Sequence, residues 1–303
     1  MSDQLILTSS EMRAWQTCQR GWWLTYYRKL RRKYDMPKLP TIGTLFHSGL
    51  EKYYNGEELD FLAFVAAEVL RLSEMNPDYA PEIDEAGAMA ATMLEGYFSW
   101  LEETGEDANL EVIGTEEMVE VPLGEYKLRG KIDARVRRRT DGALLQLEHK
   151  TVGNLTDHPK WAQQNPQFLT YDLLAYLTKP DGVPTDGILL NMARRVKRTA
   201  RAKPPFYGRH EVRHTIEELR NHWTHCVAIG DQISRARTQL DSGFSSHLVV
   251  PPAPSRNHMW SCACAPLGSM FDDGSDVEDY LAEFYEEHDP LKRYELEEEP
   301  HES

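Results

Sequence analysis

The segment from Gly130 to Thr151, which reads GKIDARVRRRTDGALLQLEHKT, constrains the fold more than any other part of the chain. Its Asp141-Gly142 pair is a strong signal for a two-residue type I′ hairpin turn, because both central positions of that turn need a positive φ. Residues on either side are rich in strand formers. The segment therefore predicts two antiparallel strands that meet at this turn.

Charged side chains gather on one face of the predicted hairpin. A two-residue turn places Asp133 opposite Lys150 and Arg135 opposite Glu148. Since strand side chains alternate between faces, the two carboxylates and the lysine emerge together. Opposed residues lie about 5 Å apart and diagonal ones about 7–8 Å, within reach of a shared ion. Such a group predicts a divalent-metal site of the kind that hydrolyses phosphodiesters.

A solvated strand face is the alternative interpretation of these charges. A Glu-x-Lys triplet is common, and the chain has a second one from Glu125 to Lys127. Glu148, in contrast, lies within an apolar strand, ALLQLEHK, in register with an aspartate on the partner strand. This context favours a metal site over a solvated strand face.

The pattern GxID…LEHKT resembles the core motif of the PD-(D/E)XK nuclease superfamily, and most closely its RecB-like exonuclease family, which includes CRISPR-associated and phage-encoded single-domain members. Residues 43–47 (GTLFH) resemble a GxxxH motif that supplies a histidine metal ligand, and residues 167–171 (QFLTY) resemble a QxxxY motif that follows the lysine strand. The resemblance implies an α/β fold: a restriction-endonuclease-like mixed sheet flanked by helices, with a helical insertion before the sheet.

The resemblance also implies roles for individual residues. The predicted catalytic residues are Asp133, Glu148, Lys150 and His47. Mg²⁺ or Mn²⁺ would be bound by His47, Asp133, Glu148 and the backbone carbonyl of His149. Gln167 and Tyr171 share a helix face and would position the nucleic acid.

The function implied is a metal-dependent DNA exonuclease in phage-type recombination or DNA processing, acting on DNA that is single-stranded or has free ends. The alternative is a catalytically silent nuclease fold, with or without an iron–sulfur cluster, that binds DNA or assembles with other proteins. A recombination-protein partner and an oligomer are both compatible with the sequence. Exonuclease is favoured over endonuclease by the resemblance alone.

Charge is distributed unevenly along the chain. The formal net charge is −15, but the residues from Asp272 onward hold 14 acidic side chains against only Lys292 and Arg293. Such a tail is typically disordered or a solvated helix. Basic residues concentrate in 28–33 (RKLRRK) and 194–203 (RRVKRTARAK). Both runs are candidate phosphate contacts, with Arg194, Arg195 and Lys197 predicted to bind substrate, and a solvated loop or helix end is the alternative.

Coarse periodicity predicts the order of elements. A capping box from Thr8 to Glu11 starts a helix through about Leu30, and a second helix after Pro40 carries His47. Three strands follow within 115–151, then a helix through 167–177, a buried strand at 187–191 and a long helix at 215–237. The predicted organisation is a nuclease domain at 1–271 with a helical insertion at 58–103, a metal or cluster clasp formed by 1–30 and 255–271, and an acidic tail at 272–303.

Four cysteines stand at positions 18, 226, 262 and 264. Many relatives in the resembling family hold a [4Fe–4S] cluster with one cysteine in the first helix and three near the C-terminus. Cys18 fits the first place, but in HMWSCACAPLG His258 and Gly268 stand where cysteines are expected. Cys18, Cys262, Cys264 and His258 could hold a [4Fe–4S] cluster or Zn²⁺, or form a degenerate site that binds nothing. Cys226, on an apolar helix stripe, is more typical of a core residue.

No run of apolar residues is long enough to span a bilayer, and MSDQLILTSS lacks the features of a signal peptide. We therefore expect no membrane partner and a cytoplasmic location, in the host cytoplasm if the protein is phage-encoded.

Overall fold

The computed structural model describes residues 4–33, 38–58, 60–178, 186–253 and 262–294. The chain divides into two compact units. Residues 1–35, 120–130 and 217–303 form the first unit, and residues 36–119 and 131–216 form the second. The first unit is therefore built from three separate pieces of sequence.

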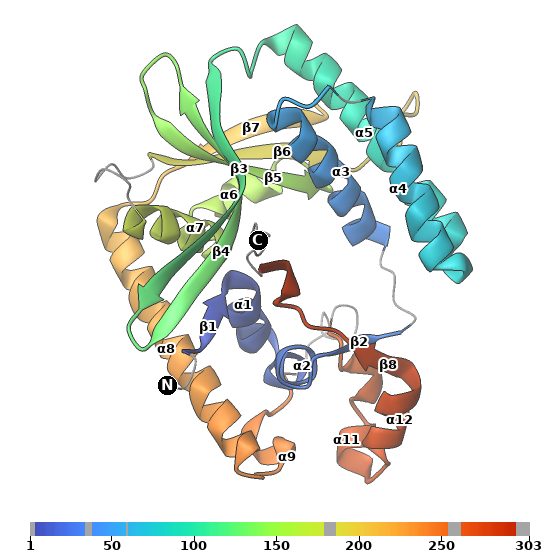
Figure 1. The fold of residues 1–303 in the computed structure, drawn as a ribbon, viewed down its shortest axis with the longest axis vertical. Coiled ribbons are helices and arrows are strands. Elements are labelled where there is room, and N and C mark those ends of the chain that lie inside the picture. The colour runs from blue at the N-terminus through green and yellow to red at the C-terminus, as the bar shows by residue number, and fades with distance from the viewer. Residues whose placement is uncertain (1–3, 34–37, 59, 179–185, 254–261, 295–303) are drawn as a thin grey trace, which may run out of the picture. The chain divides into compact units, whose positions relative to one another are not determined.

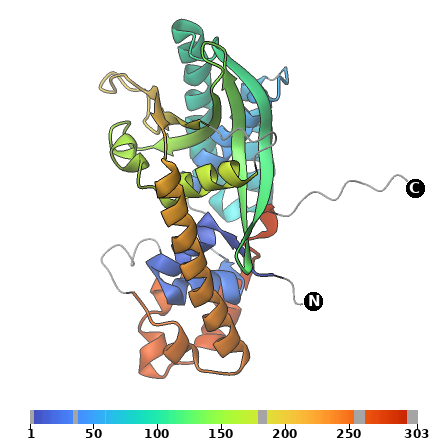
Figure 2. The ribbon, with the colours of Figure 1, turned by 90° about the vertical axis from the view of Figure 1, so that its left-hand side faces the viewer.

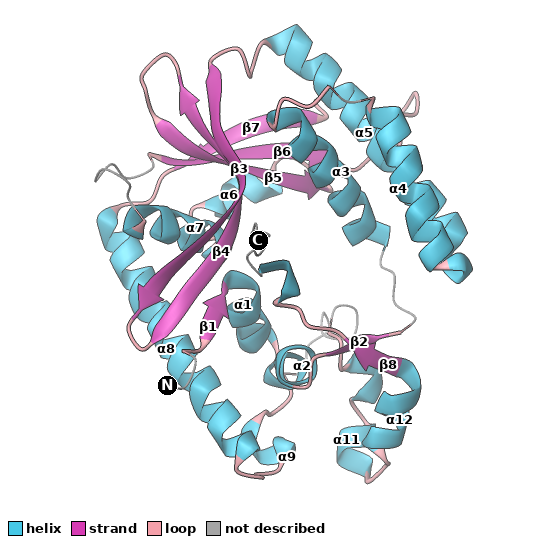
Figure 3. Cartoon of the chain, viewed as in Figure 1, coloured by secondary structure: helices cyan, strands magenta, loops and turns pink. Residues whose placement is uncertain are grey.

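The chain contains a mixed sheet whose larger part lies in the second unit (Figures 1 and 3). Its main strands are β3 (Leu110–Leu123), β4 (Tyr126–Arg138), β5 (Leu144–Val152), β6 (Gly187–Arg194) and β7 (Tyr207–Val212). β5 is antiparallel to β4 and parallel to β6, and β6 is antiparallel to β7. β3 and β4 are long paired strands that run side by side in Figure 2, and each contributes residues to both units.

Helices cover both faces of the sheet in the second unit. One face packs against α3 (Lys38–Tyr54) and α5 (Ala80–Thr104), and α4 (Phe61–Met75) lies along α5 (Figure 1). The core there joins Phe46 and Tyr97 to Val136, Leu145 and Leu147. The opposite face carries α7 (Pro166–Leu177), which follows the short α6 (Asp157–Ala162). β5 is buried along most of its length because both of its faces are covered.

The predicted fold class is confirmed: a mixed α/β architecture with helices before the sheet. The helical segment consists of α4, the 3₁₀ turn Pro77–Tyr79 and α5. Strand β7 was missed by the sequence analysis, because its polar residues Arg209 and Glu211 do not follow a simple apolar pattern.

The first unit contains short elements from both ends of the described chain and one long helix. They are β1 (Ile6–Thr8), α1 (Ser9–Thr17), α2 (Gln19–Trp22), the π-helix η1 (Trp23–Tyr27), β2 (Leu30–Arg32), α8 (Ile216–Asp241), α9 (Ser246–Val249), η4 (Ala265–Leu267), α11 (Met270–Asp273), α12 (Val277–Phe284), β8 (Tyr285–Glu287) and η5 (Lys292–Tyr294). β1 runs parallel to the start of β4, and β2 is antiparallel to β8.

The predicted continuous first helix is wrong. Cys18 has extended backbone angles (φ −163°, ψ 109°), so it ends α1 and caps α2. The start of α1 is as predicted, since Thr8 Oγ1 accepts the Glu11 N–H at 3.1 Å. The Glu11 carboxylate does not complete a capping box. It accepts hydrogen bonds from Trp22 Nε1 at 3.0 Å and Arg237 at 2.9 Å.

The acidic segment is folded as far as Tyr294, which differs from the disordered tail or solvated helix expected from its composition. Arg28 forms a bidentate pair with Glu278, with both distances 2.8 Å. Arg31 pairs with Glu286 at 2.7 Å, and Lys29 pairs with Asp289. The basic run at 28–33 is thus engaged by acidic residues of its own unit, which argues against the predicted phosphate contact.

Within the described ranges, no helix combines the length and apolar character needed to cross a membrane.

Candidate active site

The connection between β4 and β5 is longer than predicted. Arg138 N–H donates to the Ala143 carbonyl and Gly142 N–H donates to the Arg138 carbonyl, both at 2.8 Å. Gly142 has φ +73°, but Asp141 does not have a positive φ, so the type I′ turn is wrong. The Asp141 carboxylate accepts the Ala143 N–H at 3.1 Å and pairs with Arg138, which stabilises the wider loop.

The wider loop shifts the strand register by two residues. Arg135 opposes Gln146 rather than Glu148, and Ala134 opposes Leu147. Because the shift is even, each side chain keeps its predicted face. The clustering of Asp133 with Glu148 and Lys150 therefore does not depend on the turn type.

Asp133 lies just beyond the paired part of β4 and β5. Its Oδ2 accepts the His149 backbone N–H at 2.8 Å and lies 3.6 Å from His47 Nδ1 on α3. Burial acts to raise the pKa of Asp133, but His47, His149 and Lys150 hold the pKa below its usual value. Burial also lowers the pKa of His47, which favours the neutral imidazole that can bind a metal ion.

Glu148 and Lys150 follow on the same face of β5. Lys150 Nζ lies 2.5 Å from Glu148 Oε1. Burial, and next the charge of Asp133, raise the pKa of Glu148 to about 8 although Lys150 acts against this shift. A cation bound between two buried carboxylates would offset their mutual repulsion.

Gln167 and Tyr171, at the start of α7, contact the catalytic candidates directly. Gln167 Nε2 lies 3.0 Å from Glu148 Oε1 and 3.0 Å from the Tyr171 hydroxyl. The helix begins at Pro166, with Asn165 as its N-cap, which fixes Gln167 in the first turn. The contacts described for Gln167 hold Glu148, whereas the sequence predicted a contact with nucleic acid.

The His149 side chain points to the opposite face of β5. Its ring stacks on Tyr54 with centroids 5.4 Å apart, and its Nδ1 lies 2.9 Å from Asn191 Nδ2. Burial lowers the pKa of His149 to about 3, so the ring is neutral. Only the backbone of His149 therefore faces Asp133, and the predicted carbonyl ligand stays a prediction.

A buried polar network behind His149 was not found from the sequence. Arg209 of β7 donates to the hydroxyls of Tyr54 and Tyr97, both at 3.1 Å, and pairs with Asp107 at 2.5 Å. Asn191 donates to the Tyr97 hydroxyl at 2.9 Å. These residues are far apart in the sequence, so no local motif marks them.

Two further titratable residues lie near the carboxylates and were also missed. Glu116 of β3 pairs with Lys131, and its charge raises the pKa of Glu148. Glu116 has φ +50°, a strained conformation for a residue with a side chain. His158 of α6 has a pKa lowered by burial and then by the charges of Lys150 and Arg195.

The predicted substrate-binding cations have unequal surroundings. Lys197 pairs with Glu85 at 2.7 Å, and Arg194 donates to the Lys203 carbonyl at 3.1 Å. Arg195 Nε is buried and has no hydrogen-bond partner within the described part of the chain. Of the three, Arg195 is the one whose charge also acts on His158 beside Lys150.

A second donor set lies in the first unit. The sulfur atoms of Cys18, Cys262 and Cys264 all lie within 4.8 Å of one another. Cys226 is buried on α8, with its sulfur 3.4 Å from His222 Nε2. His258, the predicted fourth ligand, lies outside the described residues.

The two donor sets suit different metals. Carboxylates and a neutral imidazole at Asp133, Glu148 and His47 fit Mg²⁺ or Mn²⁺. Two features support this fit: Asp133 Oδ2 lies 3.6 Å from His47 Nδ1, and burial together with the charge of Asp133 raises the pKa of Glu148. The three thiols suit a soft metal.

Comparison with protein families gives a match over most of the chain. The model of the PD-(D/E)XK nuclease superfamily matches residues 7–245. The chain belongs to this superfamily. The predicted resemblance is confirmed at this level, and the family carries nuclease activity, with DNA as the substrate it implies.

Solved structures similar to the chain include the following two. One is a candidate exonuclease from Eubacterium rectale, with 12% identity, a TM-score of 0.47, and coverage of 86% of this chain and 87% of that one. The other, SSO0001, has 17% identity, a TM-score of 0.27, and coverage of 63% and 83%. A search of curated proteins found no match. The family assignment therefore rests on the superfamily match.

Proposed function

We propose that the protein is a metal-dependent DNA exonuclease that hydrolyses phosphodiester bonds in DNA with free ends. The observation that carries the proposal is the convergence of Asp133, Glu148 and Lys150 on one face, with His47 3.6 Å from the Asp133 carboxylate. Phage-type recombination or DNA processing, in a cytoplasm, is the setting that the sequence resemblance favours.

Asp133, Glu148 and His47 would hold Mg²⁺ or Mn²⁺, with the His149 carbonyl as a further oxygen donor. The bound ion would supply an activated water and charge stabilisation at the scissile phosphate. The His149 N–H fixes one oxygen of Asp133. Gln167 fixes Glu148. These contacts set the direction of both carboxylates before a metal ion arrives.

Lys150 is the proposed electrostatic catalyst. Its ammonium group contacts Glu148. With a metal ion held by that carboxylate, the ammonium group would be available to the attacking water or the phosphate. There it would orient the water and offset the negative charge that develops in the transition state. Arg195 and Tyr171 would help to position the DNA strand at the edge of the site. Arg194 and Lys197 would bind phosphates further along the DNA.

Cleavage of end-labelled DNA tests the proposal. Linear and circular single-stranded DNA would each be incubated with Mg²⁺, Mn²⁺ or EDTA, and wild-type protein would be compared with Asp133→Ala. Metal-dependent loss of linear DNA alone, absent in the variant, is the expected result. Cleavage of circles would make the protein an endonuclease.

A catalytically silent fold is the second candidate. The absence of cleavage of either substrate by folded wild-type protein that still binds DNA would establish it. The intact set of Asp133, Glu148 and Lys150 favours the enzyme.

A further inference from the structure

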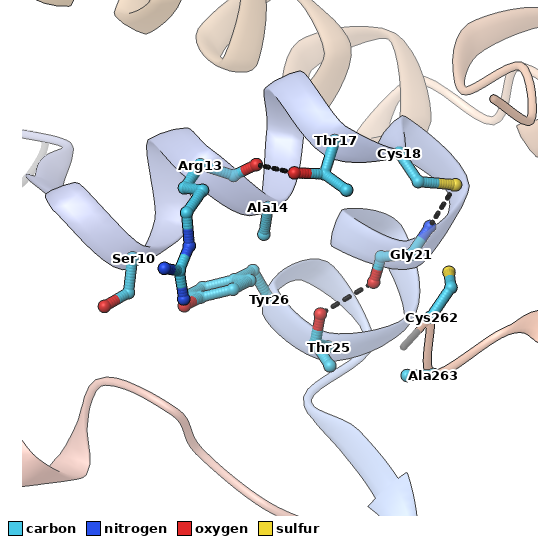
Figure 4. Close-up of a pocket in the computed structure, with 10 residues that line it drawn as sticks. All are labelled: Ser10, Arg13, Ala14, Thr17, Cys18, Gly21, Thr25, Tyr26, Cys262 and Ala263. Atoms are coloured by element: carbon cyan, nitrogen blue, oxygen red, sulfur yellow. Dashed lines mark hydrogen bonds between the residues drawn. The ribbon is translucent and has the colours of Figure 1, made fainter. Parts of the chain in front are cut away.

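The three clustered cysteines come from distant parts of the sequence. Cys18 lies between α1 and α2, whereas Cys262 and Cys264 precede η4. Cys18 and Cys264 are buried, and Cys262 lines a pocket of about 450 Å³ together with Cys18 and Gly21 (Figure 4). None of these residues takes part in the proposed phosphodiester chemistry.

The backbone around the thiols is arranged to bring them together. Gly21 N–H donates to Cys18 Sγ at 3.4 Å. A Cβ atom at Gly21 would lie only 2.9 Å from Cys262 Sγ, so this position accepts the third thiol only as glycine. The Ala263 carbonyl between the two C-terminal cysteines is held by the Tyr285 hydroxyl at 2.7 Å.

The spacing of the sulfur atoms distinguishes between two kinds of metal centre. With Zn–S bonds of about 2.3 Å, tetrahedral ligands of one ion lie ~3.8 Å apart. In a [4Fe–4S] cluster each cysteine binds a different iron at a separate corner, so the cysteine sulfurs stand much farther apart. Here all three sulfurs lie within 4.8 Å, and those of Cys262 and Cys264 are 3.2 Å apart. This spacing suits a single ion.

The number of cysteines also argues against a four-cysteine cluster. The whole chain has four, and a cluster with four cysteine ligands would need Cys226. Cys226 packs against His222 on α8 and does not belong to the group of three. The residues therefore do not fit the four-cysteine cluster that the family resemblance implies.

We propose that Cys18, Cys262 and Cys264 bind one Zn²⁺ as thiolates, with a donor other than cysteine at the fourth position. Binding releases the thiol protons and involves no oxidation or reduction. The ion ties the α1–α2 junction to the segment before η4 and so stabilises the first unit. This role is independent of the proposed nuclease activity.

Metal analysis of the purified full-length protein tests the proposal. Protein from cells supplied with both iron and zinc, purified without oxygen, is expected to contain about one zinc per chain and no visible iron–sulfur absorbance. Replacement by Co²⁺ should give intense thiolate-to-cobalt absorption. Cys262→Ser should lose the metal, whereas the matched control Cys226→Ser should keep it. Stoichiometric iron and sulfide, or metal-free protein with three freely reactive thiols, would overturn the proposal.

A glycine variant keeps the test decisive if the cysteine variants fail to fold. Gly21→Ala retains every ligand but places a methyl group against Cys262. It is expected to weaken zinc binding by about 10-fold or more in competition with a chelator. Gly153→Ala is the control, since its added Cβ meets no atom within 4 Å. Equal zinc affinity for Gly21→Ala and wild type would contradict the geometry.

Discussion

The carboxylate centre of the second unit and the thiol centre of the first differ in how their ligands are spaced along the chain. Asp133, Glu148 and Lys150 lie on two adjacent strands of one hairpin. Cys18 and Cys262 come from opposite ends of the described sequence and meet only in the folded first unit. Local geometry alone brings the first group together, whereas the second depends on the complete tertiary structure.

The two centres also differ in chemistry. Buried oxygen donors that repel one another suit an exchangeable hard cation with bound water. Three buried thiols suit a soft ion that is retained as part of the structure. We therefore expect changes at the carboxylates to alter catalysis with little effect on folding, and changes at the thiols to alter folding first.

The largest effect is expected from Lys150→Ala. Removal of this ammonium group should lower the cleavage rate by about 10²–10³-fold or more, because the charge of the transition state loses its partner. DNA binding, measured by fluorescence anisotropy with Ca²⁺ in place of Mg²⁺, should change little. The control is Lys127→Ala, which alters the second Glu-x-Lys triplet and an ion pair with Glu120. A Lys150→Ala protein with near wild-type cleavage would refute the assignment.

A smaller effect is expected from Gln167→Ala. If the side chain positions Glu148, kcat should fall by about 10–100-fold and metal affinity should fall with it, while KM for DNA stays nearly constant. An increase in KM without loss of kcat would instead support the DNA contact predicted from the sequence. Gln164→Ala, at an exposed position just before the helix, provides the control.

The smallest effect is a pH dependence of stability that arises at Glu148. Its pKa is about 8 in the fold against an ordinary value of 4.5, so the folded state holds a proton that the unfolded state has lost. Metal-free stability should therefore decline as pH rises between these two values. Metal binding competes with this proton, so the increase in Tm caused by Mn²⁺ should be larger at pH 8.5 than at pH 6.

Thermal melts with Mn²⁺ or EDTA at both pH values measure this difference. Glu148→Gln should remove most of it, and Glu125→Gln should not. An equal Mn²⁺ effect at the two pH values in the wild type would exclude Glu148 as a proton-coupled ligand.

Much of the carboxylate centre could be predicted because strand alternation tolerates an even error in register. The predicted turn type was wrong, yet Asp133 and Glu148 lie on the face of the sheet that was predicted for them. His47 belongs to α3, far from the hairpin in sequence, and only the resemblance to a known motif indicated it. Glu116 was missed because no local motif marks it, and its φ of +50° is not indicated by the sequence pattern.

The first unit was harder to predict, because its contacts join residues far apart in sequence. The composition of the acidic segment predicts that it is solvated. It does not indicate that Glu278 pairs with Arg28 or that Glu286 pairs with Arg31. In the same way, the spacing of Cys262 and Cys264 does not reveal that Gly21 leaves room for their approach to Cys18.

The three-piece composition of the first unit has a consequence for protein synthesis. The second unit, residues 36–119 and 131–216, leaves the ribosome before the rest of α8 and the later elements are synthesised. At translation rates of about 5–20 residues per second, Cys18 emerges on the order of 10 s to 1 min before Cys262. During this interval Trp15 and Trp22, which are buried in the finished fold, lack their α8 partners Gln232 and Arg237. The N-terminal segment therefore completes its packing only after α8 has been synthesised.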